Sequence, residues 1–274
     1  MFDQVVGSNG LYFRYTLPYF LTAQRRLGVP AVAFHHMGAH LWLDHYRCVG
    51  RDEAAAAFKH AGIRMASFHP GRYHYSLYAH DGTLRQICTM EYYRRCIDMA
   101  ASFECPLLVL RPTGALLDGC RERDMAALQE NVYRLQDYAA RQHVQLCLQT
   151  VTQEESPYFR TLEELHGLLA ELPSVGAALD SVCMSNAGES ITQWFSLLGE
   201  RIKHVTFQDG RGDFPRIWGE GVYPSESYAQ ELLESGYGGV ISIIGRTDRY
   251  QDDPFRADKS NRDAVCRLLR RKAV

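Results

Sequence analysis

The chain has 274 residues, of which 46% are hydrophobic and 23% are charged. This composition is typical of a globular protein with a sizeable core, and it excludes a disordered chain, a collagen and a small disulfide-stabilised scaffold. Thirty Lys and Arg residues against 32 Asp and Glu residues give a net charge of −2, so no overall field favours a nucleic acid or an anionic membrane as a partner.

The N-terminus and the apolar runs of the sequence indicate the cellular location to expect. The first ten residues, MFDQVVGSNG, carry Asp3 and Gln4 before any apolar stretch and lack the basic and apolar regions of a secretory signal. Apolar runs such as residues 106–110 are much shorter than the roughly 18 residues of a membrane span. We therefore expect a soluble, cytoplasmic protein that does not bind membranes.

The eight cysteines lie at irregular separations, and no two of them form a CxxC pair. This spacing favours neither a zinc ribbon nor a disulfide framework. We expect most of them to be reduced thiols packed in the interior.

Short apolar, β-prone runs alternate with longer amphipathic stretches along the whole chain, which is the pattern of repeated βα units around a parallel sheet. The predicted strands are residues 5–8, 31–35, 64–69, 107–111, 144–149, 176–180, 204–208 and 240–244. The predicted helices, which have apolar residues at helical spacing, are residues 17–27, 53–61, 90–103, 125–142, 162–172, 190–198, 225–235 and 261–271. Thr161 and Glu164 predict a capping box before the fifth helix.

Eight βα units of about 34 residues each are close to what a TIM barrel of roughly 250 residues uses. A doubly wound open sheet is the alternative, but no GxGxxG motif follows the first predicted strand. The long loops 37–52, 71–84 and 209–224 all follow the carboxyl ends of predicted strands, where a barrel builds its site. Without a linker in the chain, we predict one α/β domain, a (β/α)8 TIM barrel over residues 1–274.

Barrel chemistry is carried out by side chains at the carboxyl ends of the strands. The residues that the predicted strands present there are, in chain order, His35 and His36 with His40, His69, Arg111, Gln149, Asp180 with Cys183, Thr206 with Gln208 and Asp209, and Ile244 followed by Arg246.

Seven segments in this order resemble the xylose-isomerase-like TIM barrels, that is the sugar-phosphate isomerases and epimerases, and most of all the fructoselysine 3-epimerase and ketose 3-epimerase type. They are EYYRRCIDMAASF (91–103), LCLQTVTQEES (146–156), TLEELHGLLAEL, LDSVC (179–183), RIKHVTFQD (201–209), RIWGEG (216–221) and SGYGGVISI (235–243). The resemblance spans roughly residues 60–245. It implies a barrel that acts on a sugar.

The family holds a divalent metal such as Mn or Mg with a Glu of strand 5, an Asp of strand 6, a His of strand 7 and a Glu of strand 8, and the two Glu also move the proton. The resemblance places these roles on Gln149, Asp180, Thr206 and Ile244, and the strand 2 Glu of many relatives on Ala33. A single carboxylate is a poor site for a hard dication, and neither Gln nor Ile accepts a proton. We therefore expect a degenerate site with no resident metal and no other cofactor.

The polar residues that the family uses for substrate binding are better preserved. Arg216 in RIWGEG matches the family's Arg-x-Pro-Gly-x-Gly loop, with Trp218 in place of the Pro, and Glu155 and Asp209 match as well. The candidate substrate-binding residues are Arg216, Arg111, Arg246, Gln149, Glu155 and Asp209. Three guanidinium groups at one barrel mouth would favour an anion such as a sugar phosphate or sugar acid; alternatively, they pair with acidic residues of neighbouring loops.

His69, His35 and Asp180 are the candidate catalytic residues. The histidines of strands 2 and 3 could form a rearranged general base or another metal site, although buried structural histidines are the plainer alternative. For His204 we expect a buried histidine with satisfied hydrogen bonds. Asp180 could also be only a hydrogen-bonded strand end. Cys183 is expected to pack, because the sequence places no activating neighbour beside it.

Two functions remain open from the sequence. The chain is either a sugar or sugar-phosphate isomerase or epimerase with a rearranged, metal-free site, or a non-catalytic barrel that binds a carbohydrate or a partner enzyme. The aromatic residues of the segment 71–78 and Trp42 either stack on a sugar ring or close a loop. We expect a small-molecule sugar, sugar acid or sugar phosphate as ligand and no nucleic acid, and a homo-oligomer stays open.

Overall fold

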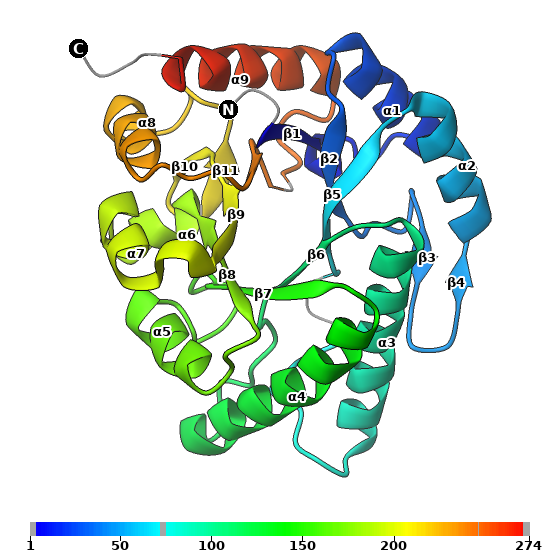
Figure 1. The fold of residues 1–274 in the computed structure, drawn as a ribbon, viewed down its shortest axis with the longest axis vertical. Coiled ribbons are helices and arrows are strands. Elements are labelled where there is room, and N and C mark those ends of the chain that lie inside the picture. The colour runs from blue at the N-terminus through cyan, green and yellow to red at the C-terminus, as the bar shows by residue number, and fades with distance from the viewer. Residues whose placement is uncertain (1–3, 72–74, 246, 271–274) are drawn as a thin grey trace.

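The chain forms a closed barrel of eight parallel strands (Figure 1). The structure, a computed structural model, describes residues 4–71, 75–245 and 247–270. The barrel strands are, in chain order, β1 (Val5–Ser8), β2 (Ala31–His35), β5 (Arg64–His69), β6 (Leu107–Leu110), β7 (Gln145–Gln149), β8 (Gly176–Asp180), β9 (Ile202–Thr206) and β12 (Val240–Ser242). β12 pairs with β1 and closes the ring. The predicted TIM barrel is confirmed.

Helices surround the barrel as an outer ring (Figure 1). Those that correspond to the predicted helices are α1 (Leu17–Arg26), α2 (Arg51–Ala61), α3 (Leu84–Ser102), α4 (Arg121–Arg141), α5 (Leu162–Ala170), α7 (Ile191–Leu198), α8 (Ser225–Glu234) and α9 (Pro254–Leu268). The elements that the sequence did not predict are short: α6 (Ser181–Asn186), the 3-10 turns η2 (Asn9–Leu11) and η3 (Gly199–Arg201), and two hairpins, β3 (Trp42–Leu43) with β4 (Cys48–Val49) and β10 (Asp209–Arg211) with β11 (Phe214–Arg216).

The two faces of each barrel strand have different roles, because successive side chains point to opposite sides. Outward-facing residues such as Phe34, Phe68 and Val205 pack in the main core cluster against the helices. Inward-facing residues such as Ala33 and Ala178 are small. The small residues leave room for larger polar side chains at the barrel axis.

Three helices begin at least four residues earlier than predicted, at residues 84, 121 and 254 instead of 90, 125 and 261. Caps define two of these starts: the Gln86 amide donates to Thr83 Oγ1 at 3.1 Å, and the Arg256 amide donates to Asp253 Oδ1 at 3.1 Å. The spacing of apolar residues does not reveal the first turn of a helix when a capping side chain stabilises that turn. The capping box predicted from Thr161 and Glu164 is confirmed.

β9 and β12 end two residues earlier than predicted, at Thr206 and Ser242. Side chains take over the backbone hydrogen bonds beyond these ends. The Gln208 amide donates to Ser181 Oγ at 2.9 Å, and the Gly245 amide donates to Gln208 Oε1 at 2.6 Å. Gln208 and Ile244 therefore lie in the loops that follow the barrel strands.

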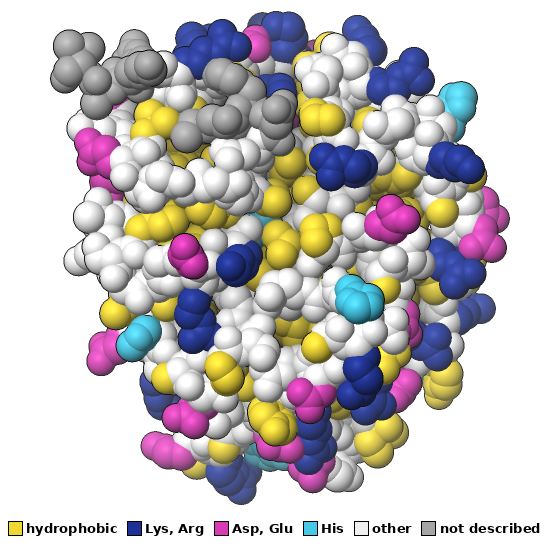
Figure 2. All heavy atoms as spheres, viewed as in Figure 1, with side chains coloured by type: hydrophobic (Ala, Val, Ile, Leu, Met, Phe, Trp, Pro, Cys, Tyr) yellow, Lys and Arg dark blue, Asp and Glu magenta, His cyan; other side chains and the backbone are white. Residues whose placement is uncertain are grey.

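Other general expectations can be compared with the structure. All eight cysteines are free thiols, and Cys96, Cys105, Cys147 and Cys183 are buried, whereas Cys120 is exposed. Basic and acidic side chains are interspersed over the face drawn in Figure 2. In the part of the chain that the structure describes, no helix is long and apolar enough to span a bilayer.

Candidate functional site

The positions that the resemblance assigned to the family's metal ligands lie at the carboxyl ends of neighbouring strands. Asp180 ends β8 and is the register partner of Thr206 at the end of β9, which in turn pairs with Ser242 of β12. Gln149 ends β7, and its Nε2 donates to Asp180 Oδ2 at 2.8 Å. Ile244 follows β12 and is fully buried.

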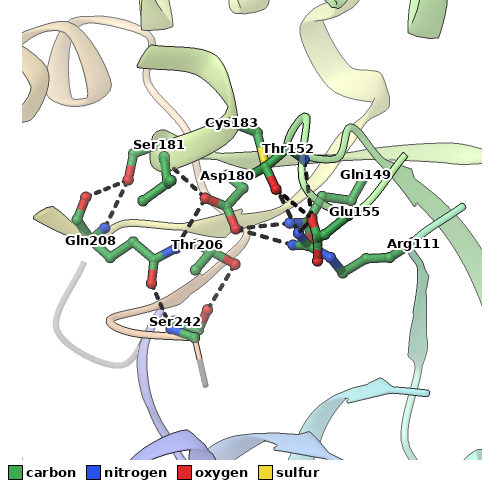
Figure 3. A network of polar contacts seen from close by, with 12 residues as sticks. Arg111, Gln149, Thr152, Glu155, Asp180, Ser181, Cys183, Thr206, Gln208 and Ser242 are labelled. Atoms are coloured by element: carbon green, nitrogen blue, oxygen red, sulfur yellow. Dashed lines mark hydrogen bonds and ion pairs between the residues drawn. The ribbon is translucent and has the colours of Figure 1, made fainter. Parts of the chain in front are cut away.

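The carboxylate of Asp180 is surrounded by donors from the protein itself (Figure 3). Oδ1 accepts hydrogen bonds from the Val182 amide at 2.9 Å and from Gln208 Nε2 at 3.0 Å. Oδ2 accepts from Gln149 Nε2 and, at 3.3 Å, from Arg111 Nη1. A carboxylate offers about four lone-pair sites, so these four donors use its accepting capacity.

Arg111 follows β6 and places its buried guanidinium between two carboxylates. It forms ion pairs with Asp180 and with Glu155, whose Oε2 also accepts from the Thr152 amide at 3.1 Å. Burial opposes the charged form, but the neighbouring Glu155, Cys183 and Asp180 outweigh it and raise the pKa of Arg111. Of the two alternatives for Arg111, pairing with acidic residues of neighbouring segments is the one that the structure shows. Arg111 therefore offers no unpaired charge to an anion.

The donor set at the family's metal position does not fit a divalent cation. Asp180 is its only carboxylate, and the lone pairs of that group already accept from protein donors. Thr206 Oγ1 accepts from Ser242 Oγ at 3.2 Å, and Ile244 has no donor atom at all. Within residues 4–71, 75–245 and 247–270, no three His, Cys, Asp or Glu side chains are grouped as a metal site.

A cavity of about 170 Å³ adjoins the ion-paired residues Arg111, Asp180 and Glu155, called the Arg111 cluster below. The hairpin β10–β11 forms part of the cavity wall. Arg111, Asp180, Cys183 and Gln208 line it. Cys183 Sγ lies 4.0 Å from Arg111 Nη2. A cation therefore stands beside this thiol, which the sequence could not show because the two residues are 72 positions apart.

Asp209 shapes the loop that follows the hairpin β10–β11. Its Oδ1 accepts from the amides of Gly210 at 2.8 Å and Tyr223 at 3.2 Å, and its Oδ2 accepts from those of Gly219 at 3.0 Å and Gly221 at 2.8 Å. A Cβ on Gly221 would overlap the Asp209 carboxylate. The carboxylate of Asp209, which was predicted to bind substrate, binds backbone amides in this geometry.

Arg216 and Arg246 complete the predicted set. Arg216 lies half-buried in β11 with its Nη1 donating to the Pro215 carbonyl at 3.0 Å, and it forms no ion pair within the described residues. Trp218 anchors the same loop in the core, with its amide donating to Asn261 Oδ1 and its Nε1 to the Phe207 carbonyl. Arg246 lies outside the described residues.

Three histidines stack through the barrel interior. The rings of His35 and His69, at the ends of β2 and β5, lie 4.3 Å apart between centroids, and His69 meets His204 edge-on at 4.9 Å. His69 Nε2 contacts Ser67 Oγ at 3.0 Å. The structure thus brings the two predicted catalytic histidines together, but places them across the barrel mouth from the residues around Asp180.

The expectation of satisfied hydrogen bonds for His204 is wrong. Both of its ring nitrogens are buried without a hydrogen-bond partner among the described residues. Its register partners on the same strand face, Ala178 and Val240, are apolar and supply none. Burial lowers the pKa of His204 to about 3, so the ring is neutral at pH 7.

The other two histidines near strand 2 have local partners. His40 Nδ1 contacts Asn9 Nδ2 at 3.0 Å and its Nε2 contacts the Tyr15 carbonyl at 2.9 Å, so the structural alternative describes His40. His36 Nδ1 contacts Tyr92 OH at 3.1 Å, and burial lowers the pKa of His36 to about 4. His36 faces a second cavity, of about 540 Å³, that the sequence did not reveal because its walls come from three separate segments.

Comparison with known proteins agrees with this fold. The sequence model of the xylose isomerase-like TIM barrel family matches residues 21–267. The chain belongs to this family.

Among curated proteins, the chain is similar to fructoselysine 3-epimerase from Shigella flexneri, with 27% identity over 131 residues that cover 46% of this chain and 47% of the relative. A second fructoselysine 3-epimerase, from Escherichia coli O157:H7, is 27% identical over 120 residues that cover 42% of this chain and 44% of the relative. The matched part spans less than half the length of these curated relatives.

Solved structures match over nearly the whole chain. 3-Keto-D-glucoside 4-epimerase from Escherichia coli has 15% identity and a TM-score of 0.78, covering 96% of this chain and 99% of that one. D-Allulose 3-epimerase from Methylomonas sp. in complex with D-allulose has 15% identity and a TM-score of 0.78, covering 97% of both chains. At these identities the likeness shows the shared fold. Proteins of this fold thus include ones that bind ketose sugars.

Proposed function

We propose that this chain binds a carbohydrate at the carboxyl end of the barrel without a divalent metal, and that the Arg111 guanidinium supplies the positive charge there. The observation that carries the proposal is the environment of Asp180, the one residue of the family's ligand set retained here. Its carboxylate accepts from four protein donors, one of them Arg111. A metal ion would have to lose water and break these bonds, with little gain from the neutral groups around it.

The net charge of the Arg111 cluster favours binding of an uncharged part of the ligand in the small cavity. Arg111 is one cation between the carboxylates of Asp180 and Glu155, which leaves one net negative charge. Hydroxyl groups of a sugar can bind there through Gln208 and Arg111, which line the small cavity. For a sugar acid or sugar phosphate, the anionic group would bind at Arg216, which has no ion pair among the described residues.

The arrangement of proton acceptors favours binding over ketose epimerisation. Gln149 and Ile244 occupy the positions that the resemblance assigns to the family's two acid/base carboxylates, and Asp180 forms an ion pair with Arg111. Positioned general acids and bases typically contribute about 10² to 10⁴-fold to a rate. Loss of that pair would therefore bring the epimerisation rate close to background.

One observation favours a second candidate, an enzyme with a rearranged acid/base set. His35 stacks on His69 at 4.3 Å and also lines the 540 Å³ cavity. A histidine at a cavity wall can exchange protons with a ligand, so these two residues are the candidates for a metal-free general base.

Two measurements on chelator-treated protein test the proposal. We expect saturation-transfer NMR to detect bound D-fructose or D-allulose without added metal, and the carbon-bound protons of these sugars to exchange with deuterated water at the background rate. We expect Arg216→Ala to weaken binding of D-fructose 6-phosphate more than that of D-fructose. A rise in Tm with micromolar MnCl2 that Asp180→Asn abolishes would contradict metal-free binding. Exchange at an enzymatic rate that stops in His69→Ala or His35→Ala would establish the second candidate.

A further inference from the structure

The 540 Å³ cavity, called the hairpin cavity below, lies between the hairpin β3–β4, the residues Pro70, Gly71 and Tyr75 that follow β5, and the helix α3. Its walls include His35, His36, Trp42, Tyr75 and Tyr92. His35 is also the last residue of β2, so the cavity begins at the strand ends of the barrel and extends outward to the hairpin. Its volume lies within the usual range of ligand pockets, about 300–1,000 Å³.

The two tyrosine hydroxyls of these walls bond to neighbouring groups of the protein. Tyr92 OH accepts from the Gly71 amide at 2.7 Å and contacts His36 Nδ1 at 3.1 Å, and Tyr75 OH contacts His45 Nδ1 at 2.9 Å. The Tyr75 and Tyr92 rings stack at 4.1 Å between centroids. With their hydroxyl groups engaged, Tyr75 and Tyr92 offer a ligand mainly the faces and edges of their rings, whereas Nε2 of His36 has no hydrogen-bond partner among the described residues.

The described residues that line the cavity offer little charge to a ligand. Asp44 is the one carboxylate among its described lining residues, and it belongs to the hairpin turn: its Oδ1 accepts from the amides of Tyr46 and Arg47, and its Oδ2 accepts from Trp42 Nε1 at 2.9 Å. The low pKa of His36 keeps that imidazole neutral at pH 7. An ionic group of a ligand would therefore lose water here without gaining a free partner of opposite charge among the described residues.

Trp42 stands at the rim of the cavity with 52% of its surface exposed. The hydrogen bond from its Nε1 to Asp44 fixes the ring, so little rotational freedom is lost when a ligand stacks on it. Flat rings and the apolar faces of sugars pack well on such an indole.

From this lining we propose that the hairpin cavity binds an uncharged ring with an apolar face that is attached to the sugar, so that the ligand is a glycoside and not a free monosaccharide. The proposal rests on the proposed carbohydrate function, because the attached sugar would occupy the barrel mouth next to His35. An aryl aglycone and a second sugar ring share this chemistry, and the experiment below distinguishes them.

Tryptophan fluorescence can report on this cavity. Trp194 and Trp218 are 0% and 6% exposed, so an added ligand or quencher acts mainly on Trp42. The probes are phenol, phenyl β-D-glucopyranoside, maltose and D-glucose, with dissociation constants measured by calorimetry. We expect phenyl β-D-glucopyranoside to protect Trp42 from acrylamide quenching and to bind at least tenfold more tightly than D-glucose.

The variants separate stacking from unfolding. Trp42→Ala should remove that tenfold advantage and Trp42→Phe should keep part of it, whereas Tyr133→Ala, which removes an equally exposed aromatic ring on α4, should keep all of it. If maltose has the advantage and the phenyl glucoside does not, the ring is a second sugar. If phenyl β-D-glucopyranoside, maltose and phenol all leave Trp42 unaffected, the inference is wrong. It is also wrong if Trp42→Ala binds these probes as tightly as the native protein. If phenol protects Trp42 but no sugar-containing probe binds, ring binding by the cavity stands and the proposed carbohydrate function fails.

Discussion

Asp180 has the residue type that the resemblance assigns to a metal ligand, but its neighbours determine its chemistry. The sequence placed Asp180, Gln149 and Arg111 at strand ends, and that placement follows from the barrel. It could not show that Arg111 reaches both Asp180 and Glu155, because these three residues lie on different βα units. Which side chains meet at a barrel mouth depends on loop conformation, and hydrophobic periodicity carries no information about it.

The ion pairs of Arg111 predict a change in both stability and metal binding. Arg111→Met leaves two buried carboxylates without their cation, so we expect a loss of about 3–5 kcal/mol in the free energy of unfolding, measured with urea at pH 7. The uncompensated carboxylates should also make this variant, unlike the native protein, more stable in MnCl2. The triple variant Arg111→Met, Glu155→Gln, Asp180→Asn should recover most of the loss.

Arg121→Met is a matched control, because it breaks an ion pair with Glu164 whose arginine side chain is 52% exposed. We expect a change below about 1 kcal/mol for this pair. Equal losses from Arg111→Met and Arg121→Met would refute the proposed importance of the buried cluster.

His204 predicts part of the acid sensitivity of the protein. Its pKa is about 3 in the folded protein and 6.5 in the unfolded chain, so folding favours the neutral ring. The resulting stability is complete above pH 6.5 and is lost as the pH falls from 6.5 towards 3. At about 1.4 kcal/mol per pKa unit, the loss is about 4 kcal/mol by pH 3.5.

The variant His204→Leu should lack this dependence and should be at least as stable as the native protein at pH 7, because it also removes two unpaired buried nitrogens. Urea denaturation between pH 7 and pH 3.5 checks the slope, with the exposed His60→Gln as control. A parallel pH dependence of the native protein and His204→Leu would show that this ring does not contribute.

At the level of elements, the length of a helix or strand determined whether it could be predicted from the sequence. The eight barrel strands are apolar, β-prone runs and the eight outer helices have apolar residues at helical spacing, so each was predicted with errors at the ends. The hairpins β3–β4 and β10–β11 have strands of two or three residues, and α6 has six residues. Such short elements carry no periodic signal. Each hairpin nevertheless forms a wall of one cavity: β3–β4 lines the hairpin cavity, and β10–β11 lines the small cavity beside Arg111.

The loop after β10–β11 depends on one carboxylate, which predicts a local effect of its removal. Asp209→Ala deprives four backbone amides of their acceptor, so we expect a loss of about 3 kcal/mol and faster hydrogen exchange confined to residues 209–223. Gly221→Ala should act in the same direction, because its Cβ would overlap the Asp209 carboxylate. The control Val222→Ala changes an exposed side chain of the same loop. Exchange that is unchanged in Asp209→Ala would contradict this role.

At the level of the whole molecule, the first and last parts of the chain are joined by a buried polar contact. Asp258 on α9 accepts hydrogen bonds from Tyr12 OH at 2.9 Å and from Gln24 Nε2 on α1 at 2.6 Å. Arg262 of the same helix donates to the Val5 carbonyl in β1 at 3.2 Å. These contacts hold α9 against the region where β12 and β1 close the barrel, and Figure 1 shows α9 between α1 and α8.

This contact predicts a pH dependence opposite in sign to that of His204. Burial raises the pKa of Asp258 from 3.8 to about 6, although the bonds from Gln24 and Tyr12 oppose the shift. Folding therefore favours the protonated carboxyl. The native protein bears no penalty from this group below pH 3.8, a growing penalty as the pH rises from 3.8 to 6, and a constant one of roughly 3 kcal/mol above that.

Asp258→Asn keeps an oxygen that can accept from Tyr12 and Gln24 but has no charge to bury. The difference in unfolding free energy between Asp258→Asn and the native protein should therefore shift by roughly 3 kcal/mol in favour of the variant between pH 4 and pH 8. Comparing the two proteins at each pH cancels the contribution of His204, which both contain. Exposed Asp263→Asn on the same helix is the control and should show no such trend. A difference that stays constant from pH 4 to pH 8 would mean that Asp258 binds protons equally in the folded and the unfolded protein, and that the contact between α1 and α9 is not sensitive to pH.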